Sequence, residues 1–389
     1  MIQERAAETF AKLGWPTPRI EEWKYTNLAP LQKIGWRTDG ETREIETPLT
    51  FGARSFAEIV FINGRLQHQS GARLNAPSDD HHFADWERNA MVALNYANMQ
   101  HGGRIEIPAG TVVDGFIHLL FVGHGDGIWS HPRNQIVVGA NAQVAIVETY
   151  TGSGAYFTNA VTEIVAGENA VVDHYRLQCE SIDAYHIGNV YIREERGANV
   201  TSRSVAVGSA LARNEVNVAL AGEGANIVLD GLFAGTGKQH LDNRTVIDHI
   251  KPHCESHELY KGILDQNARG IFDGRIIVRP DAQKTVSRQE NRNLLLSESA
   301  VVDSKPTLEI HNDDVKCNHG STIGQIEQEP LFYLRSRGIG EEEARNLLVY
   351  AFASELVDRM KIEPVREQIR RALFQTMPHR LPERRGGSR

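Results

Sequence analysis

Four short stretches, each containing an alanine and ending in Val or Ile, decide the fold of this chain: "NAQV" (141–144), "NAVV" (169–172), "GANV" (197–200) and "GANI" (224–227). Their alanines lie about 28 residues apart. Further alanines at Ala155, Ala184 and Ala212 divide these intervals into steps of 13 to 15 residues. One strand and its turn fit into such a step, so each 28-residue unit predicts a coil of two strands. Coils of this kind stack into a β-solenoid.

The main alternative for many short strands is a sandwich or a barrel, in which tight hairpin turns join alternating strands. Such turns are sparse, and the best candidate, "VVDGF" (112–116), precedes the repeat. The period therefore favours the solenoid. Its inward-facing apolar residues should form a column, with equivalent positions at Val144, Val172, Val200 and Ile227.

Periodicity and composition divide the chain into four parts. Residues 1–100 predict an N-terminal helical region, with helical spacing in "QERAAETFAKLG" and in residues 83–99. Residues 101–325 hold the β-branched runs and the repeat, and predict the β-helix core. Residues 326–376 are helical again, and the Pro, Gly and Arg content of residues 377–389 predicts a disordered basic tail.

The clearest single element is a helix within "GIGEEEARNLLVYAFASELVDRM" (338–360). Three glutamates occupy its first turn, where they favour the positive end of the helix dipole. One apolar stripe is formed by Ala344, Leu347, Leu348, Ala351, Phe352 and Leu356. This stripe must be buried. It could pack within the chain, for example on the preceding "LFYLRSRG", or on another protein, and the residues alone favour the first.

Composition excludes several classes of partner. Fifty acidic and forty-two basic residues give a formal net charge of -8, which argues against binding nucleic acid or anionic lipid. The N-terminus lacks the apolar core of a secretion signal, and no window approaches eighteen apolar residues. We expect a cytoplasmic protein without membrane contact. The cysteines Cys179, Cys254 and Cys317 are few and widely spaced, which predicts free thiols.

Familiar catalytic motifs are absent. "FAGTGKQH" (233–240) resembles the end of a phosphate loop, but it lacks the first glycine and the Ser or Thr that holds magnesium, so we expect no nucleotide to bind this chain. There is no G-x-S-x-G or C-x-x-C motif. In an extended "DHIKPHCESHELYKG" (248–262), His253, Glu255 and His257 would share one face, as a metal patch or, more simply, as a polar sheet surface.

The most concentrated set of metal-binding residue types lies in "HNDDVKCNHGSTIGQ" (311–325). If this stretch is extended, Cys317 and His319 point to the same side with Cα atoms roughly 7 Å apart. Thiolate and imidazole suit iron or zinc, but an iron–sulfur cluster takes about four protein ligands. The other ligands would have to come from elsewhere. On the residues alone, a purely structural pair remains slightly favoured.

Residues 305–356, "KPTLEIHNDDVKCNHGSTIGQIEQEPLFYLRSRGIGEEEARNLLVYAFASEL", resemble the C-terminal signature of the SufD family, whose members belong to the bacterial Suf system for iron–sulfur cluster assembly. Residues 19–28, 260–278 and 289–306 agree with the same family, and the likeness is weakest over about 30–130. The "CNHGST" context distinguishes the chain from the related SufB family, which tends to carry an acidic residue in an "HEA"-like context.

The resemblance implies a right-handed parallel β-helix between helical regions, in agreement with the 28-residue period. It also implies a non-catalytic scaffold subunit that pairs with the homologous SufB through the β-helix and with the ATPase SufC through the C-terminal helices. Cys317 and His319 would lie at the SufB contact and share a transient iron–sulfur cluster with the partner, for delivery to downstream apo-proteins. Nucleotide hydrolysis would then belong to SufC.

A second class of function stays open from the sequence. Many β-solenoids act on carbohydrates with pairs of carboxylates, and Asp303, Asp313 and Asp314 would be the acid and base candidates here. Such an enzyme should act alone, whereas the scaffold should purify with an ATPase and a homologous β-helical protein.

Overall fold

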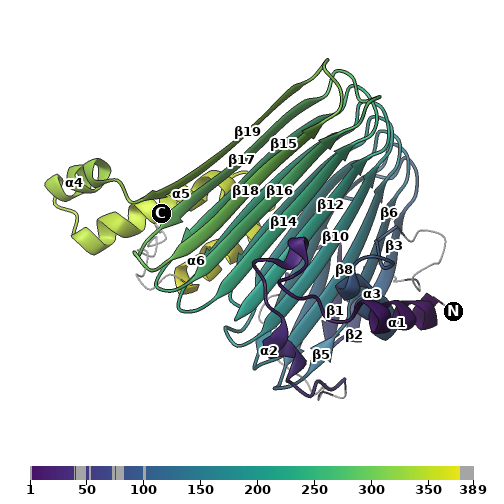
Figure 1. The fold of residues 1–389 in the computed structure, drawn as a ribbon, viewed down its shortest axis with the longest axis horizontal. Helices are drawn as coiled ribbons and strands as arrows, with labels where there is room; N and C mark the ends of the chain where they lie inside the picture. Colours follow the sequence, from purple (N-terminus) through teal and green to yellow (C-terminus); the bar gives the residue numbers. More distant parts are fainter. Residues whose placement is uncertain are drawn as a thin grey trace.

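Long strands that alternate between two sheets form the body of the molecule, and helices lie at both ends (Figure 1). The structure is a computed structural model that describes residues 2–376 except 39, 41–49, 52–53, 72–74, 76–82 and 100–101. It is mainly β, a parallel β-solenoid of about eight turns. The expected fold class is therefore confirmed, while the predicted tail, 377–389, lies outside the described residues.

The first sheet has ten strands in the order β19-β17-β15-β13-β11-β9-β7-β4-β1-β2, all parallel except the pair β1 and β2. Its members are β1 (Ala57–Ile62), β2 (Arg65–Ser70), β4 (Ile117–His124), β7 (Gln143–Ser153), β9 (Val171–Cys179), β11 (Asn199–Val207), β13 (Asn226–Gly235), β15 (Glu255–Leu264), β17 (Val286–Leu295) and β19 (Lys316–Gln325).

The second sheet follows the order β18-β16-β14-β12-β10-β8-β6-β3, with short β5 paired to β8. Its members are β3 (Gly102–Ile107), β5 (Trp129–Ser130), β6 (Arg133–Val138), β8 (Phe157–Ala166), β10 (Tyr185–Glu194), β12 (Leu211–Leu220), β14 (His240–His249), β16 (Arg269–Val278) and β18 (Val301–Ile310). From β6 onward successive strands alternate between the sheets, so each coil has two strands, as predicted.

The alanines of the four repeated stretches, Ala142, Ala170, Ala198 and Ala225, occupy one corner of the solenoid. Each is fully buried, and the residue before it has a positive φ, which asparagine and glycine adopt more readily than other residues. The corner continues beyond Ala225, with Cys254 after His253 (φ 59°) and Thr285 after Lys284 (φ 60°). Cys254 and Thr285 are also fully buried. The repeat therefore runs two coils further than its alanines indicate.

The predicted inward column is confirmed. Val144 aligns with Val172, Val172 with Val200, and Val200 with Ile227, on adjacent strands of the ten-stranded sheet. None of the four side chains is more than 5% exposed, and all belong to the main core cluster between the two sheets.

The N-terminal region is not only helical, contrary to the sequence prediction. It contains α1 (Ile2–Leu13), the 3-10 helix η1 (Glu21–Trp23), α2 (Ala29–Gln32) and α3 (Ala90–Asn98), but also β1 and β2. The apolar run of β1 is buried along its whole length and pairs in parallel with β4, so it extends the ten-stranded sheet. Periodicity in a six-residue apolar run does not distinguish a strand from a helix.

The motif "EEWKYTNL" attaches the N-terminal segment to the outer face of the second sheet. The Trp23 ring lies 3.8 Å from the buried guanidinium of Arg213, and Thr26 donates a hydrogen bond of 2.6 Å to Asp242. Arg213 forms ion pairs with Asp242 and Glu215, so its charge is compensated under the aromatic ring. The segment covers charges that would otherwise be exposed.

Three helices follow the solenoid: α4 (Gln328–Ser336), α5 (Glu341–Val357) and α6 (Glu363–Thr376). The buried residues of α5 and α6 pack on the outer face of the ten-stranded sheet, against Leu232 and Leu259 among others. The buried face of α5 differs in part from the predicted stripe, because Ala351 is exposed while Val349 and Ala353 are buried. Apolar residues surround most of this helix, so spacing alone does not select its face.

None of the helices in the described part of the chain has the length and apolar character needed to cross a membrane.

Candidate functional site

The solenoid ends in two strands that each have one neighbour. Within the described residues, β19 pairs only with β17, and β18 pairs only with β16. Their outer edges carry backbone N–H and C=O groups with no strand partner, an arrangement that favours the addition of another strand. We call the free edges of β18 and β19 the open end of the solenoid.

Cys317 and His319 both lie on β19, two residues apart, so their side chains share one face of the strand as expected. That face is the inner one. Ser256 follows Ile227 in the inward column, and Ser287 and then Cys317 follow Ser256. Cys317 packs against the end of the core cluster and is the only residue of β19 that is not exposed.

The two side chains of the site have different surroundings. Partial burial raises the pKa of the Cys317 thiol, outweighing the favourable contact of the thiolate with the Ser287 backbone, so the free thiol is protonated at neutral pH. His319 is exposed at the open end. A bound metal cation would favour the thiolate that the apolar neighbours disfavour.

The inner face changes from apolar to polar as it approaches the open end. In β17 all four central inward positions, Ser287, Gln289, Asn291 and Asn293, are polar and at most 3% exposed. The Ser256 hydroxyl lies 2.7 Å from that of Ser287, and Gln289 Nε2 donates a hydrogen bond of 2.6 Å to Glu258.

The sequence does not reveal this polar layer, because "VSRQENRN" (286–293) is hydrophilic at every position after Val286 and lacks the apolar alternation that marks a strand with one buried face. The feature of the sequence that could reveal the layer is the continuing repeat, which aligns Ser287 and Gln289 with Cys317 and His319 about 30 residues later.

The other candidate metal residues do not converge. His253 lies in the turn before β15, so it does not share a strand face with Glu255 and His257. Pro252 and the positive φ of His253 place the corner at this point. Across the part of the chain that the structure describes, no three side chains of His, Cys, Asp or Glu come together as a metal site. Glu255 and His257 alone share an exposed face of β15, and His253 does not belong to it.

The carboxylates considered for a carbohydrate enzyme are also separated. Asp303 lies near the start of β18 and is hydrogen-bonded to Arg269 at 2.7 Å, whereas Asp313 and Asp314 follow the end of that strand. The strand between them spans roughly 20 Å, while paired catalytic carboxylates lie about 5–10 Å apart. Asp314 forms an ion pair with Lys284 at 2.7 Å. This geometry does not support the enzyme alternative.

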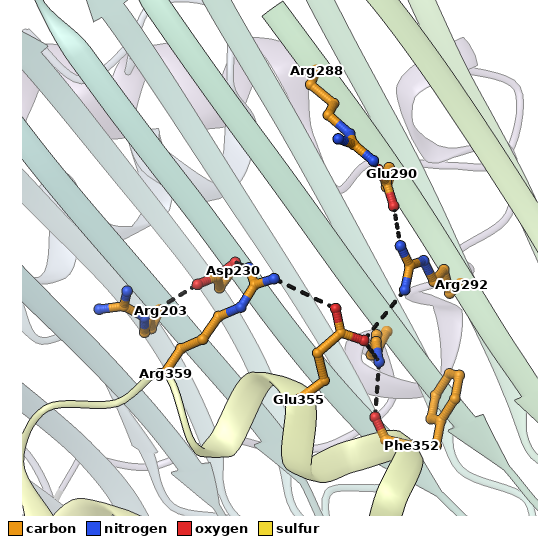
Figure 2. Close-up of polar contacts among 9 residues, drawn as sticks. Arg203, Asp230, Arg288, Glu290, Arg292, Phe352, Glu355 and Arg359 are labelled. Carbon is orange, nitrogen blue, oxygen red and sulfur yellow. Dashed lines mark hydrogen bonds and ion pairs between the residues drawn. The ribbon is translucent and has the colours of Figure 1, made fainter.

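An ion-pair network connects α5 to β15 and β17 near the open end (Figure 2). Glu355 accepts from Lys261 of β15 and from Arg292 of β17, while Lys261 also donates to the Phe352 carbonyl at 2.9 Å. Burial opposes the charged form of Glu355, but the hydrogen bond and charge of Lys261 outweigh it and hold the pKa of Glu355 below its usual range. The network holds α5 against β17, the strand next to β19, which carries Cys317 and His319.

Glu258 gives the polar layer a predicted pH dependence. Burial raises the pKa of Glu258 from 4.5 to about 7, although its contact with Gln289 partly opposes the shift. The folded chain therefore binds this proton more tightly than the unfolded chain does. The resulting stability is present below about pH 4.5 and is lost as the pH rises to about 7.

We expect Glu258→Gln to unfold with less pH dependence and to exceed the wild type in unfolding free energy above pH 7, by up to about 3 kcal/mol. Urea denaturation at pH 5 and pH 8 measures both effects. Equal dependence on pH in the two proteins would contradict the assignment.

Comparison with known proteins shows the family of this chain. Residues 121–352 match the family model described as "SUF system FeS cluster assembly, SufBD core domain". The chain belongs to the SufB/SufD family. It is 32% identical to the iron-sulfur cluster assembly SufBD family protein slr0076 of Synechocystis, over 95% of this chain and 89% of that protein.

Two further relatives cover nearly the whole chain. Escherichia coli SufD is 29% identical over 94% of this chain and 90% of its own length, and the chloroplastic protein ABCI7 of Arabidopsis thaliana is 29% identical over 95% and 84%. The matched family region begins within β4 and contains the solenoid from there to β19, including Cys317 and His319. The chain is a subunit for iron–sulfur cluster assembly.

Proposed function

We propose that this chain is a non-catalytic scaffold subunit of the SufD type, which contributes Cys317 and His319 to a nascent iron–sulfur cluster. The observation that carries the proposal is their position, on the inner face of a strand with a free edge. Thiolate and imidazole supply two of about four ligands, so a partner across the open end would supply the rest.

The partner at the open end is SufB, a homologous solenoid whose strands would continue the stack. Two features support this choice: the unpaired edges of β18 and β19, and the exposure of Ile310 (42%) and Ile323 (53%) beside them. Strand addition would satisfy the backbone groups and bury both isoleucines. The cluster is transient and passes to downstream apo-proteins in the cytoplasm.

Co-expression with SufB and SufC tests the assembly. The purified chain should form a complex that contains both partners and retains iron and sulfide under anaerobic conditions. A chain that remains alone in the presence of both partners would refute the scaffold assignment.

SufC would dock on the C-terminal helices. In α4, Phe332 is 73% exposed and Tyr333 57% exposed, and this helix lies beyond the sheets at the end of the molecule far from α1 (Figure 1). Adjacent exposed aromatic residues are typical anchors of protein interfaces. Nucleotide hydrolysis belongs to SufC in this proposal, in keeping with the missing phosphate loop.

The double variant Phe332→Ala/Tyr333→Ala should reduce SufC binding at least roughly tenfold, because loss of two aromatic anchors commonly removes 2 kcal/mol or more. Pull-down with tagged SufC measures the loss, and SufB binding should persist. Ile182→Ala, at a residue 68% exposed outside these helices, serves as the control. Unchanged SufC binding would place the SufC-binding surface elsewhere.

Point substitutions test this surface better than a deletion does. They leave the sheet covered, whereas deletion of 326–389 would expose the apolar surface under α5 and α6.

A further inference from the structure

Gln289 is a buried amide with one paired and one unpaired polar atom. Its Nε2 donates to Glu258 Oε2 at 2.6 Å, but its Oε1 has no hydrogen-bond partner among the described residues although the side chain is fully buried. Across the lumen Gly274 leaves room for the amide, since a Cβ there would lie 2.4 Å from Gln289 Nε2. The surroundings are thus shaped to this side chain and leave one acceptor free.

A buried acceptor without a donor is unfavourable, so native structures rarely keep one without a reason. The side chain that follows Gln289 on the same inner face is His319, directly aligned with it on β19. Aligned side chains on neighbouring strands have Cβ atoms about 5 Å apart, within reach of a glutamine and an imidazole. His319 has no side-chain partner of its own in the described part of the chain and can supply the missing N–H.

We propose that Gln289, oriented by Glu258, is a positioning residue that accepts a hydrogen bond from one ring N–H of His319. This contact would fix the tautomer of the imidazole and leave its other nitrogen unprotonated and directed out of the open end. Histidine ligands of metals commonly have such a partner, which orients the ring and raises its basicity. The role toward iron rests on the function proposed above, but the hydrogen bond does not.

The neighbouring inward position provides a matched comparison. The Ser287 hydroxyl lies beneath Cys317 but is already paired with Ser256, which in turn lies 2.9 Å from His249 Nε2. No unpaired acceptor therefore faces Cys317 from Ser287. Ser287→Ala removes a buried polar group from the same strand without touching the amide, so it controls for general disturbance of β17.

The hydrogen bond can be tested in the full chain without a cluster. Ring ¹⁵N chemical shifts of labelled histidine report the tautomer ratio, and the His319 signals are those lost in His319→Ala. Gln289→Leu should reduce the dominance of one tautomer roughly threefold to tenfold, the range expected for one hydrogen bond. Glu258→Gln, which still accepts from the amide, and Ser287→Ala should keep the wild-type ratio. Gln289→Met, which preserves side-chain length, replaces the leucine variant if that variant unfolds.

The same variants are then assembled with SufB and SufC and assayed for iron and sulfide. A changed tautomer ratio together with a severalfold loss of iron in the Gln289 variants supports the complete proposal. An unchanged ratio overturns it, whatever the iron content. A changed ratio, combined with full iron loading in the His319→Ala complex, would instead refute His319 as a ligand while leaving the hydrogen bond established.

Discussion

Replacing Val200 by Asp should leave no folded protein. Val200 is 1% exposed and lies between Val172 and Ile227 in the inward column. A carboxylate at this position would lie among apolar side chains, and an uncompensated buried charge costs several kcal/mol or more. Domains are typically stable by only about 5–15 kcal/mol, so this substitution removes much or all of that stability.

Soluble yield and thermal unfolding measure the effect of Val200→Asp. Val171→Asp is the matched control, because it makes the same change at an outward position of β9 that is 36% exposed. The control should fold and melt near the wild type. Equal yield and melting temperature for both variants would contradict the column.

The alternation of the solenoid could be predicted because its corner imposes a local rule. A residue with positive φ precedes a small buried residue, so asparagine or glycine followed by alanine recurs once per coil. The rule fails as a sequence signal where His253 and Cys254, or Lys284 and Thr285, occupy the corner. At these two corners tertiary contacts maintain the positive φ, which the residue types alone do not predict.

Cys317 and His319 could be located from residue type and strand alternation, whereas the groups beneath them could not. Gln289 and Glu258 are paired only through the register of β15 and β17, and both residue types are usually found at the surface. The buried face of α5 differs in part from the predicted one for a related reason, because the outer surface of the sheet decides which apolar residues are covered.

In the function that we propose, Cys317 and His319 form part of a ligand set that a partner completes. Removing either side chain should leave the fold intact, since both lie at the end of the solenoid and His319 is exposed. Association with SufB should also persist, because one truncated side chain seldom decides a large interface. Cluster content should fall to less than about a tenth of wild type. Loss of a residue that only hydrogen-bonds to a metal ligand typically lowers metal affinity at least tenfold, and loss of the ligand itself should lower it at least as much.

Cys254→Ala is the appropriate control. Cys254 occupies a corner position that is alanine in four earlier coils, so this change should be well tolerated. Its thiol contacts the Gly222 carbonyl inside the solenoid and takes no part in the site.

The decisive measurement is the iron and acid-labile sulfide content of the complex with SufB and SufC, purified anaerobically from cells that express each variant. We predict intact complexes in every case, with normal iron and sulfide for Cys254→Ala and severe loss for Cys317→Ala and His319→Ala. Wild-type iron and sulfide in the Cys317→Ala and His319→Ala complexes would contradict this prediction and make this pair purely structural.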